Sequence, residues 1–365
     1  MVGLARYTEA MKKHLSIAGV DHTLIYPQYP LPVAFSHRLL KPFGYNVHDF
    51  FNIFPVSAKF SEESVKHFSH QMMASLFTFK PNLKKVVITV HDIVPYLMRD
   101  DPHQNQYRRF YDRHMDEFAM NNIRKADRII AISEFTGQML VKHLGCPQDK
   151  IQIVLYGLDH EVFYPMKPSE AFRNKYGLSE EKQYLLYVGS ENPRKNLPRF
   201  FQAFGEARRS LPNLQLVKIG PPDHPGQYAL LQDMIHNLKI QDAVLWINHI
   251  SNHDLVTFYT FADAFVFPSL YEGFGMPPLE AMACGTPVIC SNSASLPEVT
   301  GDAALQVDPE DVAGWTHAII KVIEDQSLQQ DLITRGLARA AQFTWEKTVR
   351  ETIEVYQEVE QIYTR

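Results

Sequence analysis

The chain has 365 residues, which is too long for one ordinary hydrophobic core. Of these residues 45% are apolar and 21% are charged, a composition typical of a folded protein. The net charge of −5 gives no general attraction for nucleic acid, and no apolar run reaches the roughly 20 residues needed to span a bilayer. Three cysteines without CxxC spacing (Cys146, Cys284 and Cys290) argue against a disulfide framework or a zinc site. We therefore expect two domains, reduced thiols and a cytoplasmic location.

The chain opens with a predicted helix from Met1 to Ala18, in which apolar residues recur every three or four positions. A strand is expected from Val20 to Tyr26, and a weaker one from Asn46 to Ile53 after a proline-broken loop. The segment from Glu62 to Phe79 also has apolar residues at helical spacing. It is compatible with a peripheral membrane contact, but a helix that faces the core is the preferred interpretation.

A buried parallel strand is predicted for Lys85 to Val90, because β-branched residues form a nearly continuous run there. This strand delivers His91 and Asp92 to its carboxyl end, where ligands bind in open α/β sheets. A ligand-binding role for the pair is preferred to the alternative, a capping aspartate beside an uninvolved histidine.

The rest of the first half continues this alternation. The helix expected from Gln106 to Lys125 shows no evident chemistry, and its charges are interpreted as a solvated face. Strands are expected at Asp127–Ile132 and Ile151–Tyr156. The segment from Gly157 to Pro168 then has the character of an interdomain linker.

The second half starts with a strand at Tyr184–Val188, a turn with the sequence GSENPRKN and a helix from about Leu197. Arg194 and Lys195 lie at this strand-to-helix turn, where cations oppose the helix dipole, so a phosphate clamp is preferred to a solvated basic pair. Further strands and three closing helices follow from the same patterns: Leu214–Ile219, Val244–Ile247, Ala264–Phe267, Pro287–Cys290 and Ala303–Val307, then Val312–Asp325, Leu328–Arg339 and Trp345–Tyr363.

A glycine- and proline-rich turn from Glu272 to Pro278 separates two of these strands, and a short helix from about Leu279 to Cys284 follows it. The amino end of such a helix suits an anion, usually phosphate. Glu272 and Glu280 frame the turn, eight residues apart. Because carboxylates repel phosphate, their expected task is to accept hydrogen bonds from neutral hydroxyls; a turn residue and a dipole-complementing helix residue are the alternatives.

Alternating strands and helices in both halves predict an α/β protein with two doubly wound, Rossmann-like domains that face each other across a cleft. The expected boundaries are 1–160 for the first domain and 161–344 for the second. The last helix, about 345–365, is expected to pack back on the first domain.

The motifs of the second half resemble those of a known family. EGFGMPPLEAMACGTPVI is similar to the signature of retaining glycosyltransferases of the GT-B fold, family four, the group that contains bacterial mannosyl- and glucosyltransferases. VGSENPRKN resembles the companion loop that binds the donor phosphates, and VITVHDIVP resembles the HD strand of the first domain. The resemblance covers nearly the whole chain and is most specific in the second half.

The resemblance implies roles for individual residues. Arg194 and Lys195 would neutralise the donor diphosphate, Glu272 would contact hydroxyls of the transferred sugar, and His91 would line the sugar pocket. Glu280 would bind the ribose, and the backbone near His249 and Ile250 would read the base. The remaining donor-binding residues implied are Gly3, Ser190, Asn196, Gly273, Phe274, Gly275, Met276, Pro277 and Leu279.

The activity implied is transfer of a hexose, mannose by first guess or else glucose, from a nucleoside-diphosphate sugar to a hydroxyl of a glycan or lipid-linked acceptor. The resemblance implies retention of anomeric configuration, no metal and no cofactor; an acidic metal-binding pair at Asp100 and Asp101 is disfavoured. Two alternatives remain: a synthase of the same fold with a soluble acceptor, and a catalytically silent binder of nucleotide sugars. Nothing in the sequence indicates nucleic acid as a partner or an oligomeric state.

Two departures from the family pattern stand out. Family members start with a strand and a glycine-containing loop before the helix that here begins near Gly3, so the first strand is expected to be missing. We expect a gene start assigned too late or a truncated chain, which a stop codon directly before Met1 would contradict. The second departure is Asn248, where relatives often have glycine; little consequence is expected, because asparagine tolerates left-handed backbone.

Overall fold

The computed structural model describes residues 3–25, 58–101, 107, 110–222 and 225–364, and the chain divides into two compact units. The first unit combines residues 1–157 with residues 345–365, and the second consists of residues 158–344. The weak strand expected at Asn46–Ile53 and the loop before it lie outside the described residues.

Within the described residues, the first unit contains a parallel sheet of four strands in the order β1-β2-β3-β4. The strands are β1 (Lys66–Phe68), β2 (Val86–Val90), β3 (Arg128–Ala131) and β4 (Ile151–Ile153). The helices are α1 (Gly3–Ile17), α4 (Leu76–Phe79), α5 (Val94–Leu97), α6 (Phe110–Asn122), α7 (Glu134–Leu144) and α16 (Trp345–Thr364), with short 3-10 turns η2 (Gln71–Ser75), η3 (Ile123–Lys125) and η4 (Gln148–Lys150).

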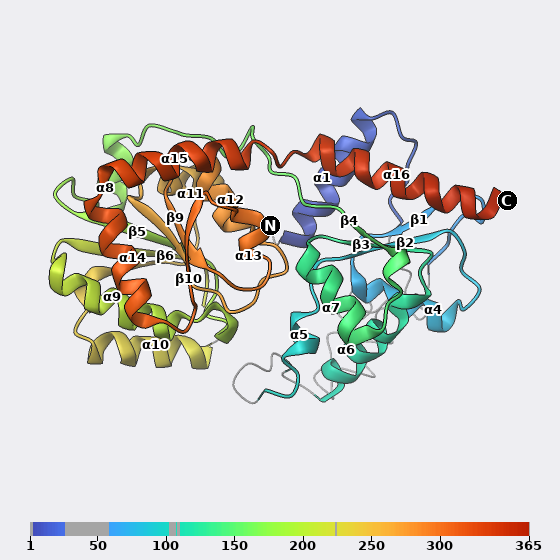
Figure 1. Ribbon diagram of the computed structural model, residues 1–365, viewed down its shortest axis with the longest axis horizontal. Helices are drawn as coiled ribbons and strands as arrows, with labels where there is room; N and C mark the ends of the chain where they lie inside the picture. Colours follow the sequence, from blue (N-terminus) through green and yellow to red (C-terminus); the bar gives the residue numbers. More distant parts are fainter. Residues whose placement is uncertain (1–2, 26–57, 102–106, 108–109, 223–224, 365) are drawn as a thin grey trace, which may run out of the picture. The chain divides into compact units, whose positions relative to one another are not determined.

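Both faces of this sheet are covered, as Figure 1 shows. On one face Val87 and Ile130 pack against α16 through Val355 and Val359. On the other face Val86, Ile88 and Ile129 join the core formed with η2, α4, α6 and α7. Burial on both faces explains why β2 is apolar at every position except the buried Thr89, instead of alternating between apolar and polar residues. The last helix of the chain, α16, also packs against α1 through Trp345 and Val349, so the ends of the sequence build one core.

The second unit contains a parallel sheet of six strands in the order β10-β9-β8-β5-β6-β7. The strands are β5 (Gln183–Val188), β6 (Leu214–Ile219), β7 (Val244–Ile247), β8 (Ala264–Phe267), β9 (Val288–Ser291) and β10 (Ala304–Val307). The helices are α8 (Glu170–Tyr176), α9 (Leu197–Ser210), α10 (Pro225–Asn237), α11 (Asn252–Phe261), α12 (Met276–Ala283), α13 (Leu296–Thr300), α14 (Val312–Glu324) and α15 (Gln326–Ala340), with short 3-10 turns η5 (Pro193–Lys195) and η6 (Gln241–Ala243).

The strand order of this sheet reverses between β5 and β8, which are neighbours although β6 and β7 lie between them in the sequence. Helices α9, α10 and α14 cover one face and α11, α12 and α15 cover the other (Figure 1). The connections that leave β5 and β8 therefore diverge to opposite faces. Such a reversal opens a crevice at the carboxyl ends of the strands, where ligands bind in doubly wound folds.

Two predicted elements of the first unit are wrong. The segment Glu62–Phe79 is not one helix: Lys66–Phe68 is strand β1, and only Gln71–Phe79 is helical, as η2 and α4. Its apolar spacing fits a helix, but pairing of β1 with β2 buries Phe68 completely, and this tertiary contact overrides the local pattern. The strand expected at Val20–Tyr26 also does not form within residues 20–25, which pair with no strand of the described sheet.

Smaller differences concern the ends of elements. Strand β4 ends at Ile153 instead of Tyr156. Helix α6 is described from Phe110 to Asn122, and Gln106, where it was expected to start, lies outside the described residues. Helix α12 begins at Met276, earlier than expected, because the prolines of the turn lie in its first turn, where the missing N–H costs nothing. None of the helices in the described ranges is long and apolar enough to cross a membrane.

Candidate functional site

The loops that follow β5 and β8 meet at the reversal of strand order in the second unit. Leu270 N donates a hydrogen bond to Arg194 O at 2.7 Å, which joins the two loops directly. Ser293, which follows β9, donates its hydroxyl to Leu270 O at 2.6 Å. Connections from three neighbouring strands therefore form one hydrogen-bonded layer at the carboxyl edge of the sheet.

The loop after β5 is shaped so that it presents two cations. Asn192 Oδ1 accepts a hydrogen bond from Arg194 N at 3.2 Å and caps the short turn η5. Asn196 follows with left-handed backbone, φ 56°, a conformation that asparagine tolerates, and helix α9 starts after it. The Asn196 side chain donates to Pro309 O at 2.6 Å, so the predicted donor-binding residue Asn196 anchors the loop from within the protein.

Arg194 and Lys195 both form ion pairs with Glu272. Arg194 Nη1 lies 2.8 Å from Glu272 Oε2, and Lys195 Nζ lies 2.6 Å from Glu272 Oε1. Glu272 and Lys195 are each only 8% exposed. The structure thus brings together Arg194, Lys195 and Glu272, three of the four residues whose side chains the resemblance places at the reacting sugar and diphosphate; the fourth is His91.

Burial alone would raise the pKa of the Glu272 carboxyl, but the charges of Arg194 and Lys195 outweigh it and lower the pKa to about 2. Glu272 is therefore an anion at every physiological pH. Two cations around one carboxylate leave this part of the site with a net positive charge.

The turn from Glu272 to Gly275 is buried, and hydrogen bonds from Ser295, which precedes α13, fix its backbone. Ser295 Oγ donates to Glu272 O at 2.9 Å and to Phe274 O at 2.6 Å. Gly275 has φ 120°, and a Cβ there would lie 2.8 Å from Leu296 Cδ2, so only glycine fits. Ser295 was not predicted to belong to the site, because nothing in its sequence neighbourhood distinguishes it from an ordinary turn residue.

Helix α12 carries the second predicted carboxylate. Glu280 is 4% exposed and its Oε2 accepts a hydrogen bond from Tyr259 Oη at 2.8 Å. Leu279 is completely buried, and its N–H donates to Gly275 O at 3.4 Å, so its side chain belongs to the core; donor binding by this residue stays a prediction. Met276 and Pro277, at the start of the helix, are half-buried.

Three more predicted donor-binding residues lie in loops at the ends of strands: Ser190 follows β5, and His249 and Ile250 follow β7. Ser190 is half-buried and its carbonyl accepts a hydrogen bond from Tyr187 Oη at 3.0 Å. His249 is exposed and Ile250 is half-buried, directly after β7, which β6 separates from β5. Asn248 does not adopt left-handed backbone.

A buried ion pair between strand β6 and the loop after β5 was not predicted. Lys218 of β6 is completely buried and pairs with Glu191, which is 2% exposed and follows Ser190 in the sequence. Lys218 Nζ also donates to Gly220 O at 2.8 Å. A single lysine within the apolar strand LQLVKI was the available signal, since lysine is almost never fully buried without a partner.

In the first unit, both ring nitrogens of His91 are engaged. Nε2 lies 2.6 Å from Ser69 O, and Nδ1 contacts Tyr156 Oη. Because a carbonyl only accepts, Nε2 carries the proton and Nδ1 accepts from the tyrosine. Burial lowers the pKa of His91, so the imidazole is neutral at physiological pH. Asp92 Oδ1 accepts a hydrogen bond from Val94 N at 3.1 Å at the start of α5, but the N-cap residue of that helix is Ile93.

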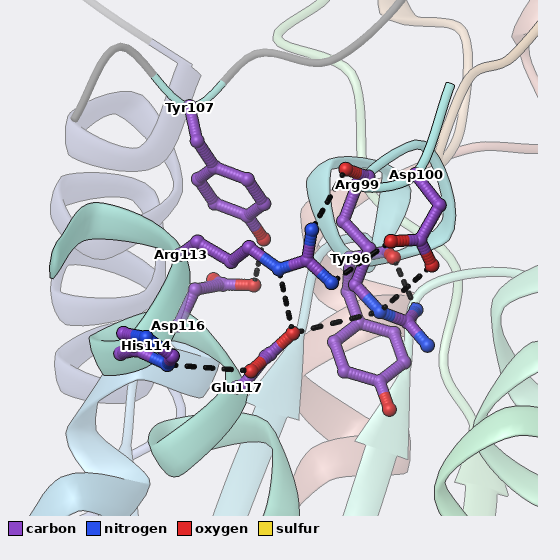
Figure 2. Close-up of polar contacts among 8 residues, drawn as sticks. All are labelled: Tyr96, Arg99, Asp100, Tyr107, Arg113, His114, Asp116 and Glu117. Atoms are coloured by element: carbon purple, nitrogen blue, oxygen red, sulfur yellow. Dashed lines mark hydrogen bonds and ion pairs between the residues drawn. The ribbon is translucent and has the colours of Figure 1, made fainter. Parts of the chain in front are cut away.

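Asp100, one residue of the acidic pair Asp100 and Asp101, belongs to a cluster of charged residues between α5 and α6 (Figure 2). Asp100 Oδ1 lies 2.8 Å from Arg113 Nη2, and Asp100 Oδ2 lies 3.6 Å from Arg99 Nε. The Asp100 carboxylate therefore neutralises the charge of these arginines. In helix α6, Asp116 is only 3% exposed and accepts a hydrogen bond from Tyr107 Oη. Burial raises the pKa of Asp116 to about 6. The prediction that the charges of this helix form a solvated face is therefore wrong for Asp116.

Comparison with known proteins places the chain in a family. Residues 1–162 match the family described as Glycosyltransferase Family 4, and residues 168–339 match the one described as Glycosyl transferases group 1. O-antigen chain mannosyltransferase B of Escherichia coli is 32% identical over 286 residues, which are 77% of this chain and 72% of that protein. O-antigen chain mannosyltransferase RfbU of Salmonella typhimurium is 30% identical over 281 residues, 77% and 70% of the two chains. The chain spans a smaller share, 33%, of serotype-specific mannosyltransferase WbdA of Escherichia coli, to which it is 29% identical.

Solved structures share the fold. Sucrose-phosphate synthase from Thermosynechococcus elongatus superimposes with a TM-score of 0.73 at 21% identity, over 98% of this chain and 93% of that one. Anabaena HepE, in complex with UDP and glucose, gives a TM-score of 0.68 at 16% identity, over 95% and 89%. Two Rossmann-like α/β units, each built on a sheet of parallel strands, define a glycosyltransferase of the GT-B type. The chain belongs to glycosyltransferase family 4, as its resemblance to that family indicated.

Proposed function

We propose that this enzyme transfers a hexose, mannose by preference, from a nucleoside-diphosphate sugar to a hydroxyl group of a glycan or lipid-linked acceptor, with retention of anomeric configuration. The observation that carries the proposal is the convergence of Arg194 and Lys195 at the reversal of strand order, beside the amino end of α12. Similarity to two O-antigen mannosyltransferases supports mannose and a glycan acceptor.

In the proposed site the two cations bind the diphosphate and stabilise the negative charge that develops on it as the sugar leaves. No metal is required for this, because guanidinium and ammonium groups supply the positive charge. Glu272 contacts hydroxyls of the sugar, and Glu280, held by Tyr259, accepts from the ribose. The role predicted for His91 at the transferred sugar stays a prediction.

The first test is thermal unfolding of the enzyme with GDP-mannose, UDP-glucose and ADP-glucose, each in EDTA. A ligand that binds only the folded state stabilises it by about 2.7 kcal/mol at a hundredfold excess over Kd. We expect a shift with GDP-mannose that EDTA does not remove. A shift only after metal is restored would contradict metal independence, and no shift with any nucleotide sugar would contradict the donor site.

The second test is transfer itself. With GDP-mannose and an O-antigen-type oligosaccharide acceptor, we expect a mannosylated product. Its new anomeric carbon, observed by NMR, should have the α configuration of the donor. A β product would contradict retention. Transfer to a soluble sugar phosphate in preference to the oligosaccharide would instead favour the synthase alternative.

A further inference from the structure

Glu272 already holds both cations that the proposed function assigns to the donor diphosphate. Its two oxygens lie 2.6 Å from Lys195 and 2.8 Å from Arg194, with the carboxylate largely buried between them. A carboxylate oxygen and a phosphate oxygen are equivalent partners for these groups, since both are anionic acceptors. The carboxylate and the diphosphate therefore compete for the same two side chains.

The two anions cannot share the cations without cost, because like charges in a site of low dielectric repel each other strongly. Each cation has a further contact that does not involve the Glu272 carboxylate. Arg194 Nη1 donates to Tyr271 O at 2.8 Å, and Lys195 Nζ lies 4.7 Å from the centre of the Phe267 ring. Both cations are therefore held in place by the protein when the carboxylate turns away.

The backbone at Glu272 is also held independently of its side chain. Ser295 Oγ bonds to the carbonyls of Glu272 and Phe274, at 2.9 and 2.6 Å. A change of partner at Glu272 therefore requires rotation of one side chain and no movement of the loop.

We propose, on the basis of the proposed function, that donor binding is an exchange of partners at Glu272. The diphosphate takes Arg194 and Lys195, and the released carboxylate accepts hydrogen bonds from hydroxyls of the transferred sugar. A nucleoside diphosphate without its sugar takes the same cations but leaves Glu272 without a new partner. Glu272 thus makes the enzyme discriminate the loaded donor from the spent nucleotide, which favours release of the product.

The exchange predicts a result opposite to that of a static ion pair. In Glu272→Gln the competing charge is absent, so we expect GDP and inorganic pyrophosphate to bind about tenfold more tightly by isothermal titration calorimetry. We expect the affinity for GDP-mannose, relative to that for GDP, to fall several-fold, and turnover to fall with it. A static pair that only shapes the site predicts weaker binding of all three ligands, because the cations lose their anchor.

Two further variants make the measurement specific. Glu310→Gln removes the same charge from an exposed pair with Arg199 in the same unit, 3.1 Å between the charged atoms, and should leave all three affinities unchanged. Glu272→Asp keeps the charge but is too short to reach both cations, so GDP affinity should rise by a smaller factor; this variant also replaces Glu272→Gln if the latter does not fold. GDP is exchanged for UDP or ADP with the matching nucleotide sugar if the wild type prefers that base.

The outcomes separate the two hypotheses. If the wild type binds none of the nucleoside diphosphates, the proposed function fails and the exchange fails with it. If the wild type binds one of them and Glu272→Gln binds it equally or more weakly, the exchange alone is contradicted.

Discussion

Tyr259 Oη lies 2.8 Å from Glu280 Oε2, and both side chains are buried between α11 and α12. The hydroxyl donates to the carboxylate and so restricts the orientation of Glu280. Tyr259 has no role in the family resemblance and was not selected from the sequence. It is a positioning residue for the carboxylate that the proposed function assigns to the ribose.

Tyr259→Phe removes this hydrogen bond and keeps the aromatic ring in the core. We expect nucleoside diphosphate affinity to fall by roughly five- to tenfold, because Glu280 loses its fixed orientation, and Glu280→Gln to weaken it further. Isothermal titration with the preferred nucleoside diphosphate measures both. Tyr184→Phe is the matched control, since it deletes another hydroxyl of the second unit, bonded to Ser179 N at 2.8 Å. Equal losses in Tyr259→Phe and Tyr184→Phe would mean a general packing effect.

Lys195→Ala or Arg194→Ala should lower turnover by on the order of 100-fold, as the loss of a group that stabilises developing charge does. Each substitution also leaves the buried Glu272 with one cation, so the melting temperature should fall. Steady-state kinetics with the preferred donor measures the first effect and calorimetry the second. Arg199→Ala, which removes a cation of helix α9 that pairs with the exposed Glu310, should change neither substantially. Full turnover in both active-site variants would remove the phosphate-binding role.

The buried pair of Lys218 and Glu191 should be essential for stability but replaceable as a unit. Lys218→Met leaves an unpaired buried carboxylate and should lower the free energy of unfolding by about 3–5 kcal/mol. Glu191 Oε2 has no hydrogen-bond partner among the described residues, so its second oxygen offers little compensation. The double variant Lys218→Met with Glu191→Gln should recover most of the loss in urea denaturation. A double variant less stable than either single one would contradict this account.

Asp116 should make the stability of the first unit depend on pH in an unusual direction. Burial raises its pKa to about 6 from an ordinary value of 3.8, so the folded state binds more protons than the unfolded state between these values. The contribution of Asp116 to stability is therefore full below about pH 4 and is lost as the pH rises through about 6. Asp116→Asn removes this dependence, and the difference in unfolding free energy between wild type and variant should change between pH 4 and 7. A difference that is constant over this range would place the pKa of Asp116 near its ordinary value.

Much of the second unit was predictable from the sequence. The strands at Leu214–Ile219, Val244–Ile247 and Ala264–Phe267 are confirmed residue by residue, because each is a short apolar run bounded by turn residues. In the first unit the helix predicted for Glu62–Phe79 is wrong, because the apolar residues at helical spacing include Phe68 of strand β1. Pairing with β2 decides that segment, and β2 starts 18 residues after β1 ends.

The sequence by itself marked Arg194 and Lys195 as members of a site, because cations at a strand-to-helix turn oppose the helix dipole. For Glu272 and Glu280 the pattern left a structural role open, and the resemblance to the family decided for ligand binding. It assigned the cations and Glu272 to different parts of a ligand, whereas the tertiary structure pairs them with each other. Lys195 and Glu272 are 77 positions apart, so their contact depends on the order of β5 and β8 in the sheet. Tyr259, Ser295 and the Lys218–Glu191 pair became visible only in three dimensions. Local patterns select residue types for a site, but the partners of a buried charge are set by strand order and loop packing, which bring distant residues into contact.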